Sequence, residues 1–151
     1  MIRKFQMEDI NQVMKIWLDS NIDAHNFIKQ EYWISNAPDV KKQLMNAEIY
    51  VYEQESKIVG FVGMQDNYLA GIFVDKDIRS NGIGKQILKY IKGIRQEFTL
   101  RVYKENKGAV NFYEREGLTT ITEEMDEATN NIELLMQWKA DDFYDSTIVG
   151  N

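Results

Sequence analysis

The chain has no cysteine and a single proline, Pro38, among its 151 residues. The absence of cysteine excludes disulfides, thiolate metal ligands and catalysis through a cysteine nucleophile. With one proline, few helices or strands are forced to break. No apolar run approaches the ~18 residues that a membrane-spanning helix needs, and the first residues do not resemble a signal peptide. We therefore expect no membrane association and a cytoplasmic location.

Basic charge is also scarce, since 18 Lys and Arg residues stand against 24 Asp and Glu residues, a net charge of -6. A nucleic-acid-binding protein carries a dense basic face, and none is visible here, so no nucleic-acid partner is predicted. An acidic surface either attracts cationic ligands such as amines or serves solubility alone. Hydrophobic content of 44% is typical of one folded domain. Residues 140–151 form an acidic, aromatic tail.

Apolar periodicity divides the rest of the chain into helices and strands. In chain order we expect a strand at 2–5, a helix at 7–19, an aromatic segment at 25–33, a short helix at 39–46, a hairpin of strands 48–52 and 58–62, a strand at 69–74, a helix at 83–94, a strand at 99–103, a helix at 107–116 and a hairpin of strands 118–125 and 132–138. The polar residues 19–21 suggest a break, and Pro38 suits the first turn of the short helix. This order predicts a mixed α/β layered domain.

A glycine-bearing turn between the strand at 69–74 and the following helix is the sharpest local feature. Gly82 and Gly84 open that helix, and Arg79 precedes them. Helix N-termini have unpaired backbone N–H groups that bind phosphate, and glycine lets the anion approach the backbone. A Walker loop is excluded because Gln86 follows Lys85, and a Rossmann fingerprint because Ile87 replaces the third glycine. The alternative that these glycines form a tight turn and bind no ligand remains open.

A second segment, residues 106–118, pairs a polar helix start with an aromatic side chain. Asn106 is a suitable N-cap for the helix that follows. Tyr113 lies seven residues, roughly two helical turns, further on, so both side chains lie on one face. Phe112 is assigned to the core, and Gly117 is a suitable C-cap.

Together these segments resemble the GNAT acetyltransferase superfamily. Arg79-x-x-Gly82-x-Gly84 is similar to the acetyl-CoA pyrophosphate loop of that family, and Asn106-x-x-Ala109-x-x-Phe112-Tyr113-x-x-x-Gly117-Leu118 is similar to its second cofactor segment. The resemblance covers residues 1–139 and is closest to small stand-alone bacterial members. It implies a GNAT-like, mostly antiparallel sheet of 6–7 strands flanked by helices.

The resemblance also implies an activity, the transfer of an acetyl group from acetyl-CoA to a primary amine by direct attack in a ternary complex. The strands around Val74 and Val102 would separate to admit the pantetheine arm, and a strand N–H would polarise the thioester carbonyl. Tyr113 would protonate the leaving thiolate. The implied cofactor-binding residues are Phe73, Val74, Arg79, Ser80, Asn81, Gly82, Ile83, Gly84, Lys85 and Asn106. No metal is implied.

The family's usual base, a carboxylate on the central strand, is missing, because residues 68–71 read Tyr-Leu-Ala-Gly. The candidates are His25, the only histidine, Asp66, or a chain of waters. Trp17, Phe27 and Tyr32, with neighbouring Trp33, are candidates to line the acceptor pocket, though some belong to the core.

The acceptor is either a small-molecule amine or an amine of a protein or peptide, and the enzyme is a monomer or a homodimer. The missing carboxylate keeps a rival interpretation open, a non-catalytic acyl-CoA-binding or sensing domain. A toxin-like acetyltransferase acting on aminoacyl-tRNA is a second rival, which the acidic charge disfavours.

Overall fold

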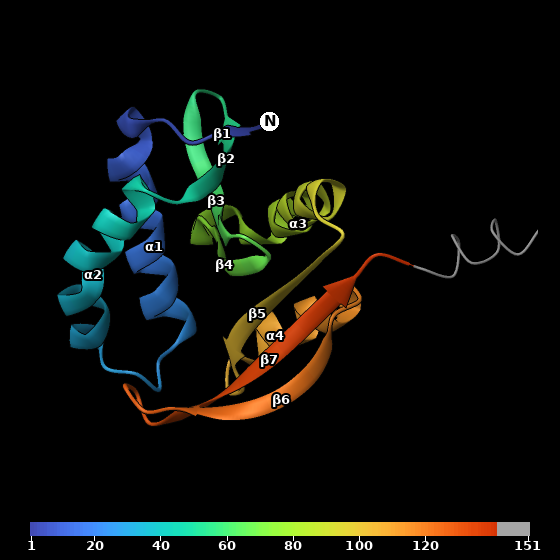
Figure 1. The fold of residues 1–151 in the computed structure, drawn as a ribbon. Helices are drawn as coiled ribbons and strands as arrows, with labels where there is room; N and C mark the ends of the chain where they lie inside the picture. The colour runs from blue at the N-terminus through green and yellow to red at the C-terminus, as the bar shows by residue number, and fades with distance from the viewer. Residues whose placement is uncertain (142–151) are drawn as a thin grey trace, which may run out of the picture.

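The structure, a computed structural model, describes residues 1–141, except for the side chains of residues 79 and 80. This part of the chain forms one seven-stranded sheet flanked by four α-helices (Figure 1). The elements are β1 (Ile2–Lys4), a 3-10 turn (Met7–Asp9), α1 (Ile10–Ala24), α2 (Gln30–Met45), β2 (Glu48–Gln54), β3 (Lys57–Gln65), β4 (Tyr68–Val74), a 3-10 helix (Lys76–Asn81), α3 (Ile83–Ile94), β5 (Glu97–Tyr103), α4 (Lys107–Arg115), β6 (Thr119–Asp126) and β7 (Asn131–Lys139). The predicted fold class is confirmed.

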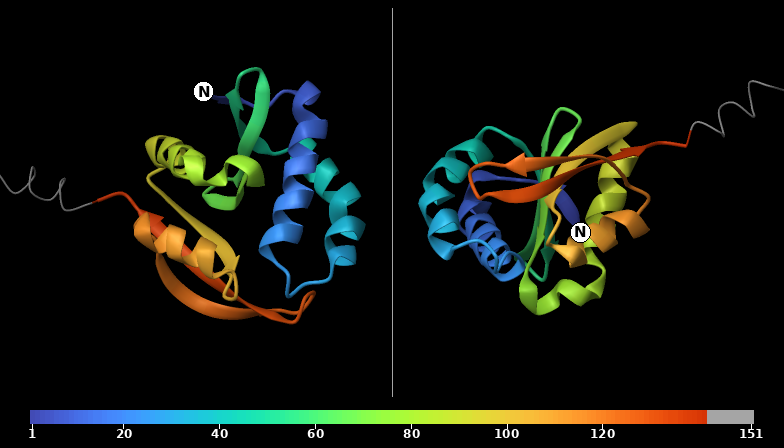
Figure 2. Two further views of the ribbon diagram at one scale, coloured as in Figure 1. Left: turned by 180° about the vertical axis from the view of Figure 1, so that it is seen from behind. Right: turned by 90° about the horizontal axis from the view of Figure 1, so that it is seen from below.

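The strand order is β1-β2-β3-β4-β5-β7-β6, and every neighbouring pair is antiparallel except β4 and β5. Helices α1 and α2 cover one face of the sheet, and α3 and α4 cover the other, as the view from below in Figure 2 shows. Both predicted hairpins are present, β2–β3 and β6–β7. No helix in residues 1–141 is long and apolar enough to cross a membrane.

Each face of the sheet has its own hydrophobic core. On the α3 and α4 side, Leu88 and Ile91 are fully buried against strand residues such as Phe98 and Leu100. On the α1 and α2 side, Trp17 and Trp33 meet edge to face at 6.0 Å over Phe61. Burial of each such side chain stabilises the fold by about 1.5–3 kcal/mol.

The first helix is longer than predicted, because α1 continues through the polar residues 19–21 to Ala24. Ser20 and Asn21 are buried but have partners: the Ser20 hydroxyl donates to the Val74 carbonyl at 3.2 Å, and the Asn21 amide donates to the Trp17 carbonyl at 2.9 Å. Polar residues that are hydrogen-bonded inside a protein do not end a helix. The expected break was wrong because a tertiary contact satisfies Ser20 and a contact within α1 satisfies Asn21.

The second helix was also predicted too short. Helix α2 begins at Gln30, absorbs the end of the expected aromatic segment, and contains Pro38 in its interior. Proline removes one backbone donor and disfavours a helix interior by about 3 kcal/mol. Trp33, packed between α1 and α2, anchors the first half of this helix and offsets that penalty.

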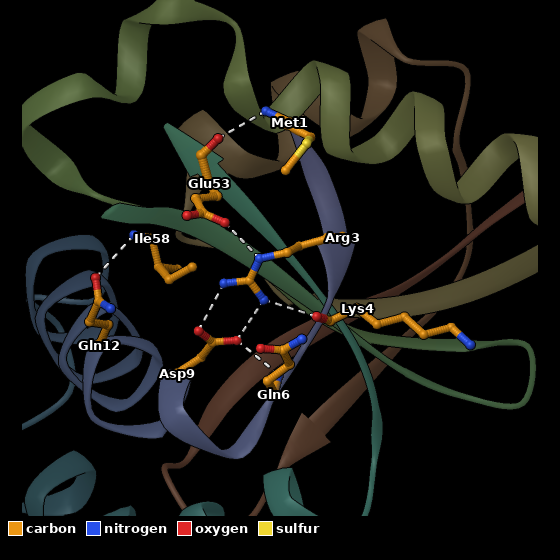
Figure 3. A network of polar contacts seen from close by, with 8 residues as sticks. All are labelled: Met1, Arg3, Lys4, Gln6, Asp9, Gln12, Glu53 and Ile58. Atoms are coloured by element: carbon orange, nitrogen blue, oxygen red, sulfur yellow. Dashed lines mark hydrogen bonds and ion pairs between the residues drawn. The ribbon is translucent and has the colours of Figure 1, made fainter. Parts of the chain in front are cut away.

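A cluster of charged residues fixes the start of the chain (Figure 3). The Arg3 guanidinium donates Nη1 and Nη2 to the two Asp9 carboxylate oxygens at 2.9 and 3.0 Å, and Nε to Glu53 at 2.7 Å. The backbone N–H of Gln6 donates to the same Asp9 at 2.8 Å. These contacts join β1, the start of α1 and the end of β2.

The remaining local predictions are mostly confirmed. Asn106 caps α4, since its side-chain Oδ1 accepts from the Ala109 N–H at 3.2 Å. Gly117 follows α4 with a positive φ of 93°, as its C-cap role requires. Of the predicted acidic tail, residues 142–151 lie outside the described part of the chain.

Candidate active site

The central feature of the site is the junction between the parallel strands β4 and β5. They are paired only at Tyr68 and Thr99, next to a hydrogen bond of 2.9 Å from the Thr99 N–H to the Asn67 carbonyl. Towards Val74 and Val102 the two strands have no further paired residues, as expected from the sequence. Their facing backbone groups therefore lack a strand partner, and they suit a ligand that offers amide donors and acceptors, as pantetheine does.

The glycine turn lies directly after β4. Residues 76–81, including Arg79, Ser80 and Asn81, form a 3-10 helix, and Gly82 follows with φ of 77°. A left-handed conformation of this kind favours glycine. A Cβ at Gly82 would meet nothing within 4 Å, so the position requires glycine for backbone geometry and not for space.

The N-terminus of α3 meets the requirements of an anion site. Its N-cap residue is Gly82, which makes no side-chain cap, and its first turn contains no acidic residue. Ile83 is buried and fixes the helix, whereas Asn81 and Lys85 are exposed. Gly84 lies against Phe112 and Val74, and a Cβ added to this glycine would lie 3.7 and 3.9 Å from their nearest side-chain atoms. The unpaired N–H groups and the helix dipole fit a pyrophosphate.

Tyr113 comes from α4 and is 8% exposed, within the core that α3 and α4 share with the sheet. Its ring meets that of Phe112 at 5.3 Å. Burial, and secondarily the proximity of Tyr68, raise the pKa of the Tyr113 phenol above its ordinary value. The phenol is therefore protonated at neutral pH, as a proton donor must be.

The structure brings His25 and Asn106 together, although 81 residues separate them. The two side chains meet at 3.2 Å between Asn106 Nδ2 and His25 Nε2. On the other side of the ring, His25 Nδ1 lies 3.1 Å from the Asn21 carbonyl oxygen. Since the carbonyl can only accept and the amide Nδ2 can only donate, Nδ1 carries the proton and Nε2 accepts.

This arrangement fixes the charge state of His25. The ring is neutral, and both of its nitrogens are engaged. Burial lowers the pKa of His25 below its ordinary value, with the Asn21 carbonyl as a smaller opposing contribution. A histidine whose lone pair already accepts a hydrogen bond cannot take a proton from an amine in this geometry. Both ring nitrogens of His25 thus have hydrogen-bond partners within the described residues.

Aromatic rings surround His25. Trp33 stacks on it at 5.3 Å, while Phe27 and Tyr103 meet it edge to face at 5.6 and 5.2 Å. Tyr32 packs edge to face on Trp33 at 4.9 Å. Phe27 and Tyr32 are half-buried. Trp17 is 7% exposed and packs in the core beside Trp33, and the assignment of these three residues to an acceptor pocket stays a prediction.

Asp66, the other candidate base, lies in the β3–β4 turn, where its φ is 55°. That turn adjoins Tyr68, at the paired end of β4, whereas the strands separate towards Val74. Asp66 is thus at the opposite end of β4 from the glycine turn. Within residues 1–141, no group of three or more His, Asp or Glu side chains could hold a metal.

Three polar residues next to this cluster, Asp126, Thr129 and Glu133, were not predicted from the sequence. The Tyr103 hydroxyl donates to Asp126 Oδ2 at 2.6 Å, and Asp126 also accepts from the Thr129 hydroxyl at 3.0 Å. Glu133 lies directly opposite Tyr103 in the β5–β7 ladder. Their position at the β6–β7 turn carries no sequence motif, so only strand pairing could have found them.

Comparisons with known proteins agree with this geometry. Residues 23–139 match the model of the acetyltransferase (GNAT) domain. The chain is 33% identical over 140 residues to the peptidyl-lysine N-acetyltransferase YiaC of Escherichia coli K12, covering 91% of this chain and 96% of YiaC. The solution structure of apo YjaB from Escherichia coli superposes with a TM-score of 0.81 at 23% identity, over 93% of this chain and 98% of YjaB.

A further solved structure of this fold, a streptothricin-type acetyltransferase from Bacillus anthracis in complex with acetyl coenzyme A, matches with a TM-score of 0.57 at 23% identity over 63% of each chain. GNAT enzymes take their acetyl group from acetyl-CoA, and the unpaired β4 edge and the uncapped start of α3 fit that molecule. The extended match to the domain model and to YiaC establishes that this chain belongs to the GNAT acetyltransferase family, and that it is an acetyl-CoA-dependent N-acetyltransferase.

Proposed function

We propose that the acceptor is the side-chain amine of a lysine in a protein or peptide, and that catalysis resides in residues 1–139. Support comes from the similarity to YiaC, which is named a peptidyl-lysine N-acetyltransferase. The half-buried rings of Phe27 and Tyr32 offer apolar walls for a lysine side chain. The compartment proposed is the cytoplasm, and the oligomeric state is a monomer or a homodimer.

The donor half of the site would bind acetyl-CoA through backbone groups. Phe73 and Val74 would bind the pantetheine arm at the unpaired edge of β4, and the backbone of residues 80–85 would hold the pyrophosphate. Acetyl-CoA supplies an acetyl group activated as a thioester. A backbone N–H of β4 would stabilise negative charge on the thioester oxygen.

Tyr113 would protonate the departing thiolate, and this assignment rests mainly on its burial beside the unpaired strands. Asn106 and His25 would fix the start of α4, and hence the position of Tyr113, through the Nδ2–Nε2 contact of 3.2 Å. The amine would attack directly, since the chain has no cysteine to form an acyl-enzyme.

Replacement of Tyr113 by Phe tests the function. We expect kcat on a lysine peptide to fall by about 10²-fold or more, because proton donation typically contributes 10²–10⁴. The Kd of acetyl-CoA, measured by calorimetry, should change by less than about threefold, since the phenol acts on the leaving group and not on binding. Phe112→Leu, which alters the neighbouring ring without touching the phenol, is the matched control. A wild-type protein that binds acetyl-CoA yet acetylates only small amines would contradict the proposed acceptor.

A further inference from the structure

We propose that Glu133 accepts the proton of the acceptor ammonium and so replaces the carboxylate that β4 lacks. The inference rests on the proposed function, because it concerns the amine that the enzyme acetylates. It starts from a gap in the mechanism: a lysine amine is mostly protonated at pH 7, and the nucleophile must be neutral. Both ring nitrogens of His25 are engaged, and Asp66 is at the far end of β4.

The strand register places Glu133 at the right end of the sheet. Tyr103, the last residue of β5, is paired with Glu133, and the ladder continues with a hydrogen bond of 2.8 Å from the Lys104 N–H to the Ile132 carbonyl. Directly opposed residues of antiparallel strands project to the same face. Since Tyr103 meets His25 and Phe27, Glu133 lies on the face that carries the aromatic cluster, beside the end of β5 that leaves β4.

The other acidic side chains of this region are already occupied. Asp126 accepts from Tyr103, Thr129 and the Ala128 N–H. Glu124 pairs with Arg101, and Glu123 pairs with Lys104. Within residues 1–141, the Glu133 carboxylate has no hydrogen bond or ion pair, although it is half-buried. An acid in this state is available to an incoming cation.

The charges around Glu133 also suit a proton acceptor. Burial is the main cause that raises the pKa of Glu133, with Asp126 and Glu124 of β6 acting in the same direction and Arg101 of β5 opposing them. The phenols facing it, Tyr103 of β5 and Tyr32 of α2, are neutral, and burial raises the pKa of both. A raised carboxylate pKa brings the group nearer to that of the amine and makes proton transfer less unfavourable.

The step balances as follows. One proton passes from the lysine Nζ to the Glu133 carboxylate, directly or through one water. The freed nitrogen lone pair forms the N–C bond with the acetyl carbon, and the C–S bond breaks with its electron pair on sulfur. The thiolate takes a proton from Tyr113. The Nζ loses its second proton as the amide forms, and net one proton leaves to solvent when Glu133 and Tyr113 regain their starting states.

Glu133→Gln tests the inference, because it keeps the shape of the side chain and removes its basicity. The acceptor is a peptide with one lysine and a free N-terminus, and mass spectrometry locates the acetyl group. We expect kcat/KM to fall by about 10²-fold at pH 7. The loss should shrink as pH rises, because more of the amine is neutral without a base. The acetyl-CoA Kd should not change.

Two comparisons separate a proton acceptor from a structural residue. Glu123→Gln, which removes an exposed carboxylate of the neighbouring strand, should leave kcat/KM and its pH profile as in the wild type. A thialysine peptide, whose amine has a lower pKa, should be less sensitive to Glu133→Gln than the lysine peptide. Equal losses for both peptides at every pH, or a loss below about threefold where general-base catalysis should contribute far more, would overturn the inference. Acetylation of the N-terminal amine in place of lysine would overturn the proposed acceptor alone, since the Glu133→Gln ratio is measured on either amine.

Discussion

Helix α1 is held at both ends by polar contacts, but the two ends differ in charge. At its start, Arg3 binds both Asp9 and Glu53, so these three charges each have a partner of opposite sign (Figure 3). At its end, neutral His25 meets the amide of Asn106 across 81 residues. Nearby, the buried indole N–H of Trp33 has no hydrogen-bond partner in the described residues, and the Glu133 carboxylate forms no ion pair there.

The difference separates contacts that hold the fold from contacts that leave reactive groups available. A fully paired charge cluster resists change and offers nothing to a ligand. A neutral His–Asn contact fixes geometry without adding a charge to the aromatic cluster around His25, and the carboxylate of Glu133 forms no ion pair within the described residues. Stability and chemistry therefore depend on different ends of one helix, and each end can be altered separately.

The largest expected effect comes from breaking the charged end with Arg3→Met. Asp9 is buried, and loss of its partner should lower the free energy of unfolding by about 3 kcal/mol at pH 7. The hydrogen bonds from Arg3 are the first cause of the lowered pKa of Asp9. The ionised Asp9 carboxylate therefore contributes its full stabilisation above the ordinary pKa of about 3.9. This contribution is lost as pH falls through the lower pKa that Asp9 has in the folded protein. Urea unfolding between pH 7 and 3 should show the two proteins converging in acid.

Lys15→Met is the matched control for that change. Lys15 also binds a carboxylate, Asp19, at 2.7 Å on α1, but it is 77% exposed. Solvent and salt screen such pairs, so no measurable change in stability is expected. A loss comparable to that of Arg3→Met would refute the distinction between a buried and an exposed ion pair.

A smaller effect on stability is expected at the C-terminal end of α1, where His25 meets Asn106. Asn106→Ala removes the N-cap of α4 and should lower the free energy of unfolding by about 1 kcal/mol. Asn106→Asp keeps a capping oxygen and should recover most of that stability, while it removes the donor to His25. Thermal unfolding of the wild type, Asn106→Ala and Asn106→Asp measures these differences in stability. Equal destabilisation by both substitutions would show that the His25 contact, and not the cap, carries the stability.

The smallest effect concerns the titration of His25, which NMR can follow without ambiguity because the chain has one histidine. In the wild type the pKa should lie below 6.5, since burial lowers it. Just below pH 6.5 the His25 ring is protonated in the unfolded chain but not in the folded chain. The free energy of unfolding therefore falls as pH drops through about 6.5. In Asn106→Asp a carboxylate would face Nε2 and should raise the pKa by about one unit or more. An unchanged pKa would mean that the two side chains do not meet in solution.

Several parts of the fold could be predicted from the sequence because they depend on interactions between neighbouring residues. The β6–β7 hairpin, the N-cap at Asn106 and the C-cap at Gly117 depend on neighbours in the sequence. The lengths of α1 and α2 could not be predicted from the sequence. Ser20 is compatible with a helix interior because its hydroxyl donates a hydrogen bond to the carbonyl of Val74, 54 residues away. Pro38 is tolerated inside α2 because the packing of Trp33 on Trp17 holds that helix in place.

The candidate site divides in the same way. Gly82, Gly84 and Asn106 were predicted because phosphate binding and helix capping need particular residues at fixed positions, whereas the role of Tyr113 was implied by the resemblance to the GNAT family. Glu133 and Asp126 were not, because a carboxylate on a strand has no distinguishing neighbours. Their relevance appears only when β7 is paired with β5.

The sequence by itself determined the glycine turn before α3, the order of strands and helices, and the absence of any cysteine chemistry. The tertiary structure alone decided that His25 is neutral and hydrogen-bonded at both nitrogens, that Asn106 is its partner, and that Glu133 lies opposite Tyr103. The physical reason is the range of each interaction. Backbone conformation is set within a few residues, whereas the ionisation and availability of a side chain depend on what the fold packs against it.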